Sequence, residues 1–497
     1  MASFITKCSF CGIAIALVVG LFGFLTGDMV LSDLAGPVPV LGEGGYDVKD
    51  LVAPSASGTK LQVLAWILGQ WRGGRIIRRA LLNSNHPETL RQLSLQVDER
   101  IPSLDMPIRK TELHEGYADE ERAQLAENPT QYLSQLDSSK YPYHSIEDYH
   151  RLYVSGDRTP TQVLKRVLAA VGEFNPTIKA VQDLLPESVI MAMATAMKDE
   201  IKIKGLPNLL GTNPEAPLPG KPKAEKENDP VVQALLDAGA ILLGTTTMHE
   251  YGVSPLGYNS WYQGPLNAFN TSYFTGGSSS GSATAVAAGL VPFAIGFDGG
   301  GSIRIPSSWS GVVGLAPTFG RVNFESSSTP VFSTIHCGPI AATVADAAHV
   351  LKVIGNTKHE VPHIYDSLYG PDGRPAVHLH ALTSPQQGRK VTVGIFQDWV
   401  HHSDPEVYRA FERTLNALDW SVYNFTMPNM GAQALSHALT ISAEFAKVLD
   451  YEIIPRLEPG SQVSGFLWPT AGLHGRDITA VEKLAMDRLK GWSMEQW

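Results

Sequence analysis

The chain has 497 residues, 43% of them hydrophobic and 18% charged, with a formal net charge of −10 at pH 7. This composition predicts a folded globular protein with one large domain or two smaller ones. The negative net charge argues against a nucleic-acid partner, because phosphate binding needs a concentrated basic surface. The three cysteines cannot form a disulfide framework, so the hydrophobic core has to stabilise the fold.

The N-terminal segment differs from the rest of the chain. Lys7 precedes an uninterrupted apolar run over residues 10–25, and the next charged residue is Asp28. Such a run is typical of a signal peptide or an uncleaved membrane anchor, with a buried helix as the alternative. We therefore assign residues 1–30 to a signal peptide or membrane anchor. This predicts a protein of the secretory pathway, either secreted or anchored in the membrane through residues 8–25.

Residues 31–140 are predicted to form an extension of helices and loops. From Tyr141 the pattern becomes more regular. Ser145 precedes Ile-Glu-Asp in a capping-box pattern, and Thr159 precedes a proline, so a helix is predicted to begin after each of them.

Helices followed by apolar strands recur further along the chain. Asp229 and Gly239 delimit the first of these helices, as N-cap and C-terminal glycine. The predicted helix–strand pairs are 231–238 with 240–243, 282–288 with 290–296, and 405–418 with 422–425, and a strand over 391–396 precedes the last pair. This alternation predicts an α/β fold whose sheet is covered by helices on both faces.

One connecting segment, residues 202–227, is rich in Pro, Lys and Glu and is predicted to be a surface loop. Two histidine pairs, His378 with His380 and His401 with His402, have no companion carboxylate or cysteine pattern. We therefore predict no metal site there.

Two segments rich in glycine and serine are the candidates for chemistry. Residues 276–282 read Gly-Gly-Ser-Ser-Ser-Gly-Ser, and residues 298–306 read Asp-Gly-Gly-Gly-Ser-Ile-Arg-Ile-Pro. Runs of glycine cost conformational entropy and occur where the backbone has to approach another group closely. Three consecutive glycines before Ser302 can align backbone N–H groups around a developing oxyanion.

Three interpretations of these loops compete. A phosphate-binding loop is excluded, because no lysine follows either glycine run at the required position. A nucleophile elbow fits residues 277–281, with Ser279 at its centre, and an α/β-hydrolase-type esterase would then use His437 or His474. That alternative leaves residues 298–306 without a role. The third interpretation treats both loops as parts of one site.

Together the two loops resemble the signature of the amidase signature family, a Gly-Gly-Ser-Ser-Gly-like loop followed by Asp-x-Gly-Gly-Ser-[IV]-Arg-x-Pro. The family's Lys-Asp dipeptide and later Lys-Gly are matched by Lys198-Asp199 and Lys204-Gly205. The resemblance, to a fungal-type amidase, covers residues 141–497. It implies the amidase signature fold, with a central mixed sheet covered by helices on both faces.

The resemblance implies a Ser–Ser–Lys triad. Ser302 would attack the amide carbonyl and carry the acyl group, Ser278 would connect it to Lys198, and the peptide bond before Ser278 would be cis. A lysine is protonated at its reference pKa of about 10.4, so burial has to keep such a base neutral. No metal and no organic cofactor is implied.

Other residues of the loops would support this triad. The resemblance implies an oxyanion hole formed by the backbone N–H groups of Gly299, Gly300, Gly301 and Ser302. The residues that would hold the loops in place are Ser279, Asp298 and Arg304.

Two departures from the family pattern bear on activity. Residues 181–197, before Lys198, lack the apolar Gly/Pro-containing strand and loop of the family, and the end at Trp497 predicts a C-terminally incomplete domain.

The leading prediction is an amidase acting on a small-molecule amide. A catalytically impaired amidase-fold protein is the second, and the acidic charge and the N-terminal apolar run disfavour an amidotransferase subunit.

Overall fold

The computed structural model describes residues 79, 87–96, 144–186, 195–214, 224–324, 333–355, 392–417, 420–448 and 478–496. The chain divides into two compact units, Ile108–Arg389 and a unit made of Met1–Pro107 with Lys390–Trp497. The apolar segment at 1–30 and nearly all of the extension at 31–140 lie outside the described residues. Those two domain assignments stay predictions.

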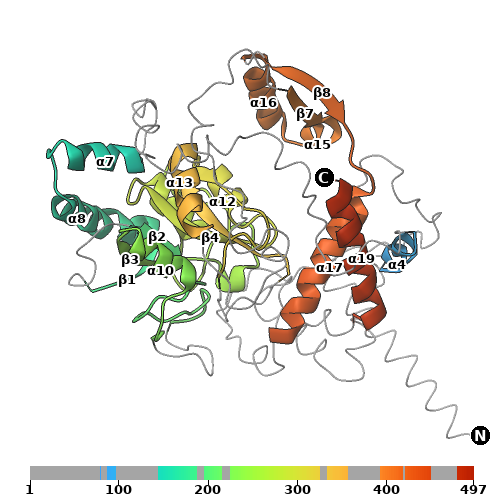
Figure 1. The fold of residues 1–497 in the computed structure, drawn as a ribbon, viewed down its shortest axis with the longest axis horizontal. Coiled ribbons are helices and arrows are strands. Elements are labelled where there is room, and N and C mark those ends of the chain that lie inside the picture. Colours follow the sequence, from blue (N-terminus) through green and yellow to red (C-terminus); the bar gives the residue numbers. More distant parts are fainter. Residues whose placement is uncertain are drawn as a thin grey trace, which may run out of the picture. The chain divides into compact units, whose positions relative to one another are not determined.

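A six-stranded mixed sheet forms the centre of the unit Ile108–Arg389 (Figure 1). Its strands, in the order β1-β3-β2-β4-β6-β5, are β1 (Val181–Leu184), β3 (Leu242–Thr246), β2 (Thr195–Lys198), β4 (Phe293–Asp298), β6 (His336–Ala341) and β5 (Val313–Gly314). Strands β3, β2 and β4 run parallel, whereas β1, β6 and β5 each run antiparallel to a neighbour. The mixed sheet predicted from the sequence is confirmed.

Helices surround this sheet. They are α7 (Ile146–Val154), α8 (Pro160–Ile178), α10 (Pro230–Asp237), α11 (Ser280–Ala287), α12 (Arg304–Trp309) and α13 (Val344–Ile354), with a short 3₁₀ turn η2 (Glu250–Gly252). Helix α11 contacts five of the strands, and α13 contacts β5 and β6. Strands β3 and β4 are buried along their whole length, as expected for strands covered on both faces.

Three helix starts predicted from the sequence are confirmed. Ser145 and Thr159 each form a complete capping box at the start of α7 and α8. Asp229 accepts a hydrogen bond from the Val231 N–H at 3.1 Å at the start of α10. Local side-chain chemistry satisfies the free N–H groups at these helix ends, which is why short sequence patterns were sufficient to locate them.

Two strands begin later than predicted, β3 at Leu242 and β4 at Phe293. In both cases the preceding helix ends in a left-handed glycine, at Gly239 and Gly289. The next N–H reaches back into the helix, from Ala240 to the carbonyl of Leu235 and from Leu290 to that of Ala285. This helix-end motif uses N–H groups that a strand would need, so each strand starts two or three residues further on.

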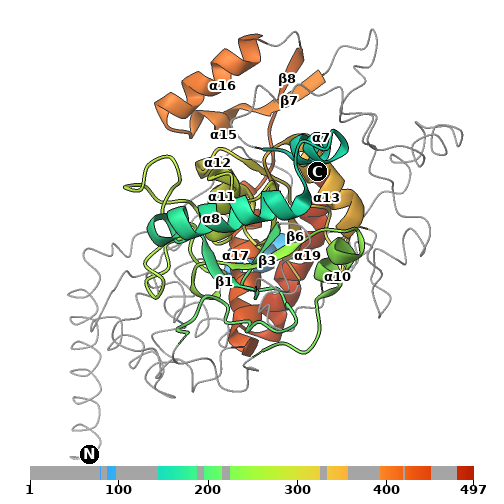
Figure 2. The same ribbon diagram turned by 90° about the vertical axis from the view of Figure 1, so that its left-hand side faces the viewer.

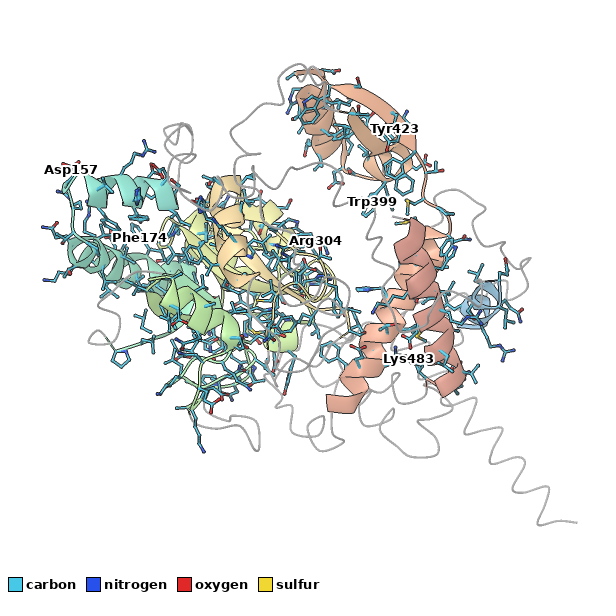
Figure 3. All side chains as sticks on the ribbon, in the orientation of Figure 1. Asp157, Phe174, Arg304, Trp399, Tyr423 and Lys483 are labelled. Carbon is cyan, nitrogen blue, oxygen red and sulfur yellow. The ribbon has the colours of Figure 1, made fainter. Side chains whose placement is uncertain are left out.

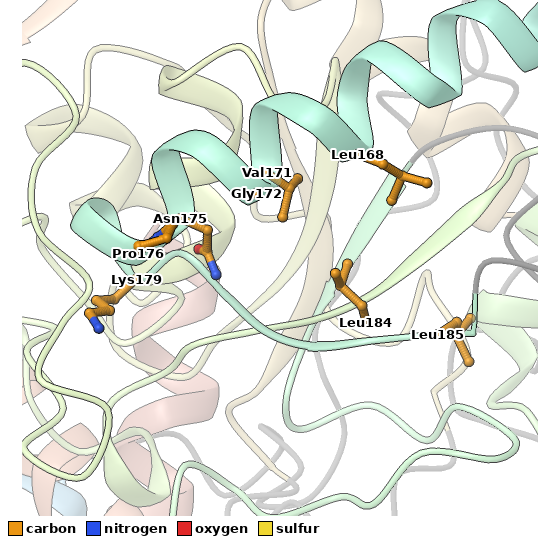
Figure 4. Close-up of a pocket in the computed structure, with 8 residues that line it drawn as sticks. All are labelled: Leu168, Val171, Gly172, Asn175, Pro176, Lys179, Leu184 and Leu185. Atoms are coloured by element: carbon orange, nitrogen blue, oxygen red, sulfur yellow. The ribbon is translucent and has the colours of Figure 1, made fainter.

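Helix α8 lies beside the edge strand β1 in both views of the ribbon (Figures 1 and 2). The side-chain amide of Asn175 makes two hydrogen bonds of 2.8 Å with the backbone of Val181. A pocket of about 500 Å³ lies between α8 and β1, lined mainly by apolar side chains such as Leu168 and Leu184 (Figure 4). None of the predicted catalytic residues lines it.

The prediction of a surface loop at 202–227 is wrong for the part that directly follows β2. Ile203, Leu206, Leu209 and Leu210 are at most 7% exposed. The buried carboxylate of Asp199 accepts hydrogen bonds from the backbone N–H groups of Leu209 and Gly211, at 3.2 and 3.0 Å. These bonds fold the segment back over the end of β2, so its apolar residues become part of the core.

The other unit contains two groups of elements. Strands β7 (Thr392–Phe396) and β8 (Ser421–Phe425) pair in parallel and accompany α15 (Gln397–His401) and α16 (Pro405–Ala417). Helices α4 (Pro87–Ser94), α17 (Met430–Val448) and α19 (Ala480–Gln496) pack around a core that includes Leu90, Met486 and Trp492. The predicted strands and helix between 391 and 425 are confirmed.

Among the described residues, no helix combines the length and the apolar character that crossing a membrane requires.

Gly281, in the first turn of α11, allows this helix to approach the sheet. A Cβ at this position would lie 2.4 Å from the Ala180 carbonyl oxygen and 2.5 Å from that of Thr247. We expect Gly281→Ala to lower the free energy of unfolding by about 2–3 kcal/mol in urea denaturation. Gly172→Ala is the matched control, because nothing lies within 4 Å of its added Cβ. Equal effects of the two changes would contradict this account.

Candidate active site

The candidate residues gather at the carboxyl ends of the parallel strands in the middle of the sheet. Lys198 is the last residue of β2, and Asp298 is the last residue of the parallel strand β4. The loop of residues 276–279 leads directly into α11, which packs on these strands. The carboxyl ends of parallel strands are where active sites of open α/β sheets form.

Lys198 and Ser278 are in direct contact. The Lys198 Nζ donates a hydrogen bond to the Ser278 Oγ at 3.0 Å, and both residues are 1% exposed. The peptide bond between Gly277 and Ser278 is cis, as the resemblance implies. This buried contact joins residues 80 positions apart in the sequence.

Ser302 lies on the neighbouring loop. Its carbonyl oxygen accepts a hydrogen bond from the Ser279 N–H at 3.1 Å, which fixes the two loops against each other. Ser302 is partly exposed, whereas Ser278 and Lys198 are buried. A substrate arriving from solvent would therefore meet Ser302 first.

Asp298 organises the loop that carries Ser302. Its carboxylate accepts hydrogen bonds from the N–H groups of Gly301 at 2.6 Å and Ile303 at 3.1 Å. It also accepts two bonds from the Arg304 guanidinium, at 2.9 and 3.0 Å. Arg304 extends from the start of α12 (Figure 3). Burial acts to raise the pKa of Asp298, but Arg304 and the backbone donors outweigh it, so this pKa is lowered.

These contacts correct one part of the expected oxyanion hole. The Gly301 N–H already donates to Asp298, so it is not free to bind a developing oxyanion. Gly299 and Gly300 are more exposed than Gly301, and no hydrogen bond from their N–H groups to another described residue is seen. The donors that fit an oxyanion hole are therefore the N–H groups of Gly299, Gly300 and Ser302.

Ser279 is placed to support the loop rather than to meet a substrate. It is fully buried, and its Oγ donates to the carbonyl and accepts from the N–H of Phe297, both at 3.2 Å. Of the two histidines that an elbow would use, His437 belongs to α17 and His474 lies outside the described residues. The burial and backbone contacts of Ser279 favour the amidase interpretation over the esterase alternative.

Reasoning from the sequence missed one acidic residue of the site. The Oε2 atom of Glu200 lies 2.9 Å from the Lys198 Nζ, and its side chain is only 5% exposed. A tight turn directly after β2, in which the Glu200 N–H donates to the Lys198 carbonyl at 2.7 Å, brings the two side chains together, and no sequence pattern signalled this contact.

Two buried ionisable groups near Lys198, His249 and Asp199, have pKa values shifted towards their neutral forms. Burial, with a contribution from the charge of Lys198, lowers the pKa of His249 to about 4. Burial raises the pKa of Asp199 to about 7, although its backbone hydrogen bonds act in the opposite direction. The site is thus a low-dielectric environment, in which a charge is expensive unless it is paired.

Arg304→Met tests the support of the loop. Because Asp298 has a lowered pKa in the folded protein, its charged form stabilises the fold above its ordinary unfolded pKa, and this contribution is lost as the pH falls. Arg304 is 61% exposed, so we expect the variant to lose only about 1 kcal/mol at pH 7. Urea unfolding should show the difference shrinking as the pH falls below about 4, where the carboxylate of the folded protein becomes protonated. A difference that does not change with pH would contradict this assignment.

Comparisons with known proteins identify the family of this chain. The family model Amidase matches residues 178–466, more than half of the chain. A fatty acid amide hydrolase of Oryza sativa subsp. indica is 26% identical over 80% of this chain and 71% of the relative. The A subunit of the glutamyl-tRNA(Gln) amidotransferase of Staphylococcus saprophyticus is 31% identical over 71% of this chain and 72% of the relative.

The solved structures that resemble this chain also include amidases. A crystal structure of an amidase matches with a TM-score of 0.56 and 27% identity, covering 71% of this chain and 79% of the other. The native peptide amidase of Stenotrophomonas maltophilia matches with a TM-score of 0.52 and 26% identity, covering 62% and 67%. The fungal-type assignment rests on motifs alone and stays a prediction. The chain belongs to the amidase family and is a hydrolase of carbon–nitrogen bonds other than peptide bonds.

Proposed function

We propose that the chain hydrolyses a carboxylic amide through an acyl-enzyme on Ser302, with Ser278 and Lys198 as the activating relay. The observation that carries this proposal is the buried hydrogen bond of 3.0 Å between Lys198 and Ser278, next to the loop that presents Ser302. A buried lysine whose amine meets a serine hydroxyl is suited to act as a base rather than as a surface charge.

The relay moves protons in two directions. As the Ser302 Oγ forms a bond with the amide carbon, its proton passes to the Ser278 Oγ, and the Ser278 proton passes to a neutral Lys198. The oxyanion of the tetrahedral intermediate accepts hydrogen bonds from the N–H groups of Gly299, Gly300 and Ser302. When the C–N bond breaks, the same proton returns through Ser278 to the leaving amine. Water then attacks the acyl-enzyme by the same relay and releases the carboxylic acid.

An apolar acyl group is the substrate feature that we propose. Phe269, Tyr273 and Phe274 precede the serine loop and are 63%, 67% and 48% exposed, and Trp309 of α12 is 48% exposed. The Asn267 side chain donates to the carbonyls of both Phe274 and Trp309, so these aromatics belong to one local framework. Exposed aromatic groups beside a catalytic loop are suited to bind an apolar substrate.

A series of p-nitroanilides with acyl chains of increasing length tests this proposal. We expect wild-type protein to release p-nitroaniline, and kcat/KM to rise with chain length by up to about tenfold per two methylenes. Phe274→Ala should flatten this dependence, whereas Phe174→Ala, which removes an equally exposed ring from α8, should not. No turnover of any amide by folded protein would count against the proposed activity.

We further propose that the protein enters the secretory pathway and is either secreted or anchored in the membrane through residues 8–25. The support is the apolar run itself, which lies outside the described residues. Carbonate extraction of membranes after expression distinguishes an anchored protein from a cleaved and secreted one. An anchored protein stays in the pellet, and a protein processed as a signal-peptide substrate appears shortened in the medium.

A further inference from the structure

The base of the proposed relay has a second partner. The Lys198 Nζ lies 2.9 Å from the Glu200 Oε2, and the two side chains are 1% and 5% exposed. The same Nζ lies 3.0 Å from the Ser278 Oγ and 5.9 Å from the centre of the Phe297 ring. The amine is therefore held between one carboxylate, one hydroxyl and an aromatic ring, away from water.

This arrangement constrains where the proton of Lys198 can go. Lys198 can accept a proton from Ser278 only when its amine is neutral, so an ammonium form has to lose a proton first. Solvent has little access to a side chain that is 1% exposed. Glu200 is a carboxylate within hydrogen-bond distance, and a buried pair without net charge avoids the desolvation cost of two separated charges.

We propose that Glu200 is a positioning residue that takes the proton of Lys198 and so supplies the neutral amine; this inference rests on the proposed function. One N–H bond of the ammonium breaks and one O–H bond forms on Oε2, so the pair keeps zero net charge. The lone pair left on Nζ then faces the Ser278 Oγ, and the carboxyl group remains hydrogen-bonded to the amine. No proton has to leave for bulk water, so the active form does not depend on pH in the neutral range.

Other ionisable groups lie around this pair. His249 and the Cys337 thiol are influenced by the charge of Lys198, and Glu200 and Asp229 also act on Cys337. Burial keeps His249 neutral above about pH 4 and raises the pKa of Cys337, so both are uncharged at pH 7. Asp199 and Glu250, whose pKa values burial raises to about 7, are the groups that titrate near neutrality. The test therefore includes Asp199→Asn and Glu250→Gln.

The rate of fluorophosphonate labelling at Ser302, measured from about pH 5.5 to 9.5 on the full chain, tests this role. Wild type and Glu200→Asp should show a flat profile between about pH 6 and 8, because each keeps an internal proton acceptor. In Glu200→Gln the side chain keeps its shape, but its amide cannot take the proton of Lys198. Its labelling rate should fall at pH 6 by about tenfold or more, with a new acidic limb of about tenfold per pH unit and recovery at high pH.

Controls separate the possible outcomes. Glu173→Gln, at an exposed position of α8, should label like wild type. The new limb of Glu200→Gln should persist in a background of Asp199→Asn and in a background of Glu250→Gln. The proposal is overturned if the profile of Glu200→Gln matches that of wild type. It is also overturned if that variant labels faster than wild type at pH 6, since Glu200 would then only keep Lys198 charged. If Glu200→Gln does not fold, an acidic limb in Glu200→Asp overturns it. Absence of labelling in folded wild type would instead refute the proposed function.

Discussion

Ser302→Ala is expected to lower kcat for amide hydrolysis by about ten-thousandfold or more, because it removes the nucleophile and leaves only oxyanion stabilisation. Ser302 is tied to the neighbouring loop through its backbone carbonyl, which accepts from the Ser279 N–H. The fold should therefore tolerate the change, with a shift in unfolding free energy of no more than about 0.5 kcal/mol. Steady-state hydrolysis of a p-nitroanilide and urea unfolding measure the two quantities.

Ser308→Ala is the matched control, since Ser308 is an exposed serine of α12 six residues further along the chain. We expect it to hydrolyse amides at the wild-type rate. Retained hydrolysis in Ser302→Ala would assign the nucleophile elsewhere and would contradict the relay as a whole.

Lys198→Met is expected to have two separate effects. It removes the base, which should lower kcat by about a hundredfold to ten-thousandfold. It also leaves the buried Glu200 without its cation, and breaking a buried ion pair from one side costs about 3–5 kcal/mol of stability. Unfolding in urea at pH 7, beside the hydrolysis assay, distinguishes these effects.

The double variant Lys198→Met/Glu200→Gln isolates the electrostatic part. Because the buried carboxylate is then also removed, most of the lost stability should return, while the hydrolysis rate should stay low. A double variant as unstable as the single one would show that packing around the lysine chain, and not the charge of Glu200, is what matters.

The parts of the fold predicted best from sequence are those decided by local chemistry. Ser145, Thr159 and Asp229 cap their helices with side chains that reach N–H groups two or three residues away. The late starts of β3 and β4 were missed because the closing bonds at Gly239 and Gly289 compete with the sheet for N–H groups. Likewise, the segment after β2 looks polar in sequence, and only the contacts of Asp199 show why its leucines are buried.

The functional site also has parts that the sequence predicted and parts that it did not. The two glycine-rich loops could be recognised from sequence, but the contact between Lys198 and Ser278 spans 80 positions and came from the family resemblance alone. The contacts of Asp298 decide which glycine N–H groups of the loop remain available. The spacing of residues in the sequence does not reveal those contacts. Glu200 was missed because its contact with Lys198 depends on a turn at the end of β2.

Mapping of the fluorophosphonate adduct by peptide mass spectrometry tests the central assignment most directly. Wild-type protein is treated with the probe and digested, and the modified serine is identified from the fragment ions. The structure predicts one adduct, on Ser302, and no adduct in Ser302→Ala. An adduct on Ser279 that survives in Ser302→Ala would contradict the account and restore the nucleophile elbow.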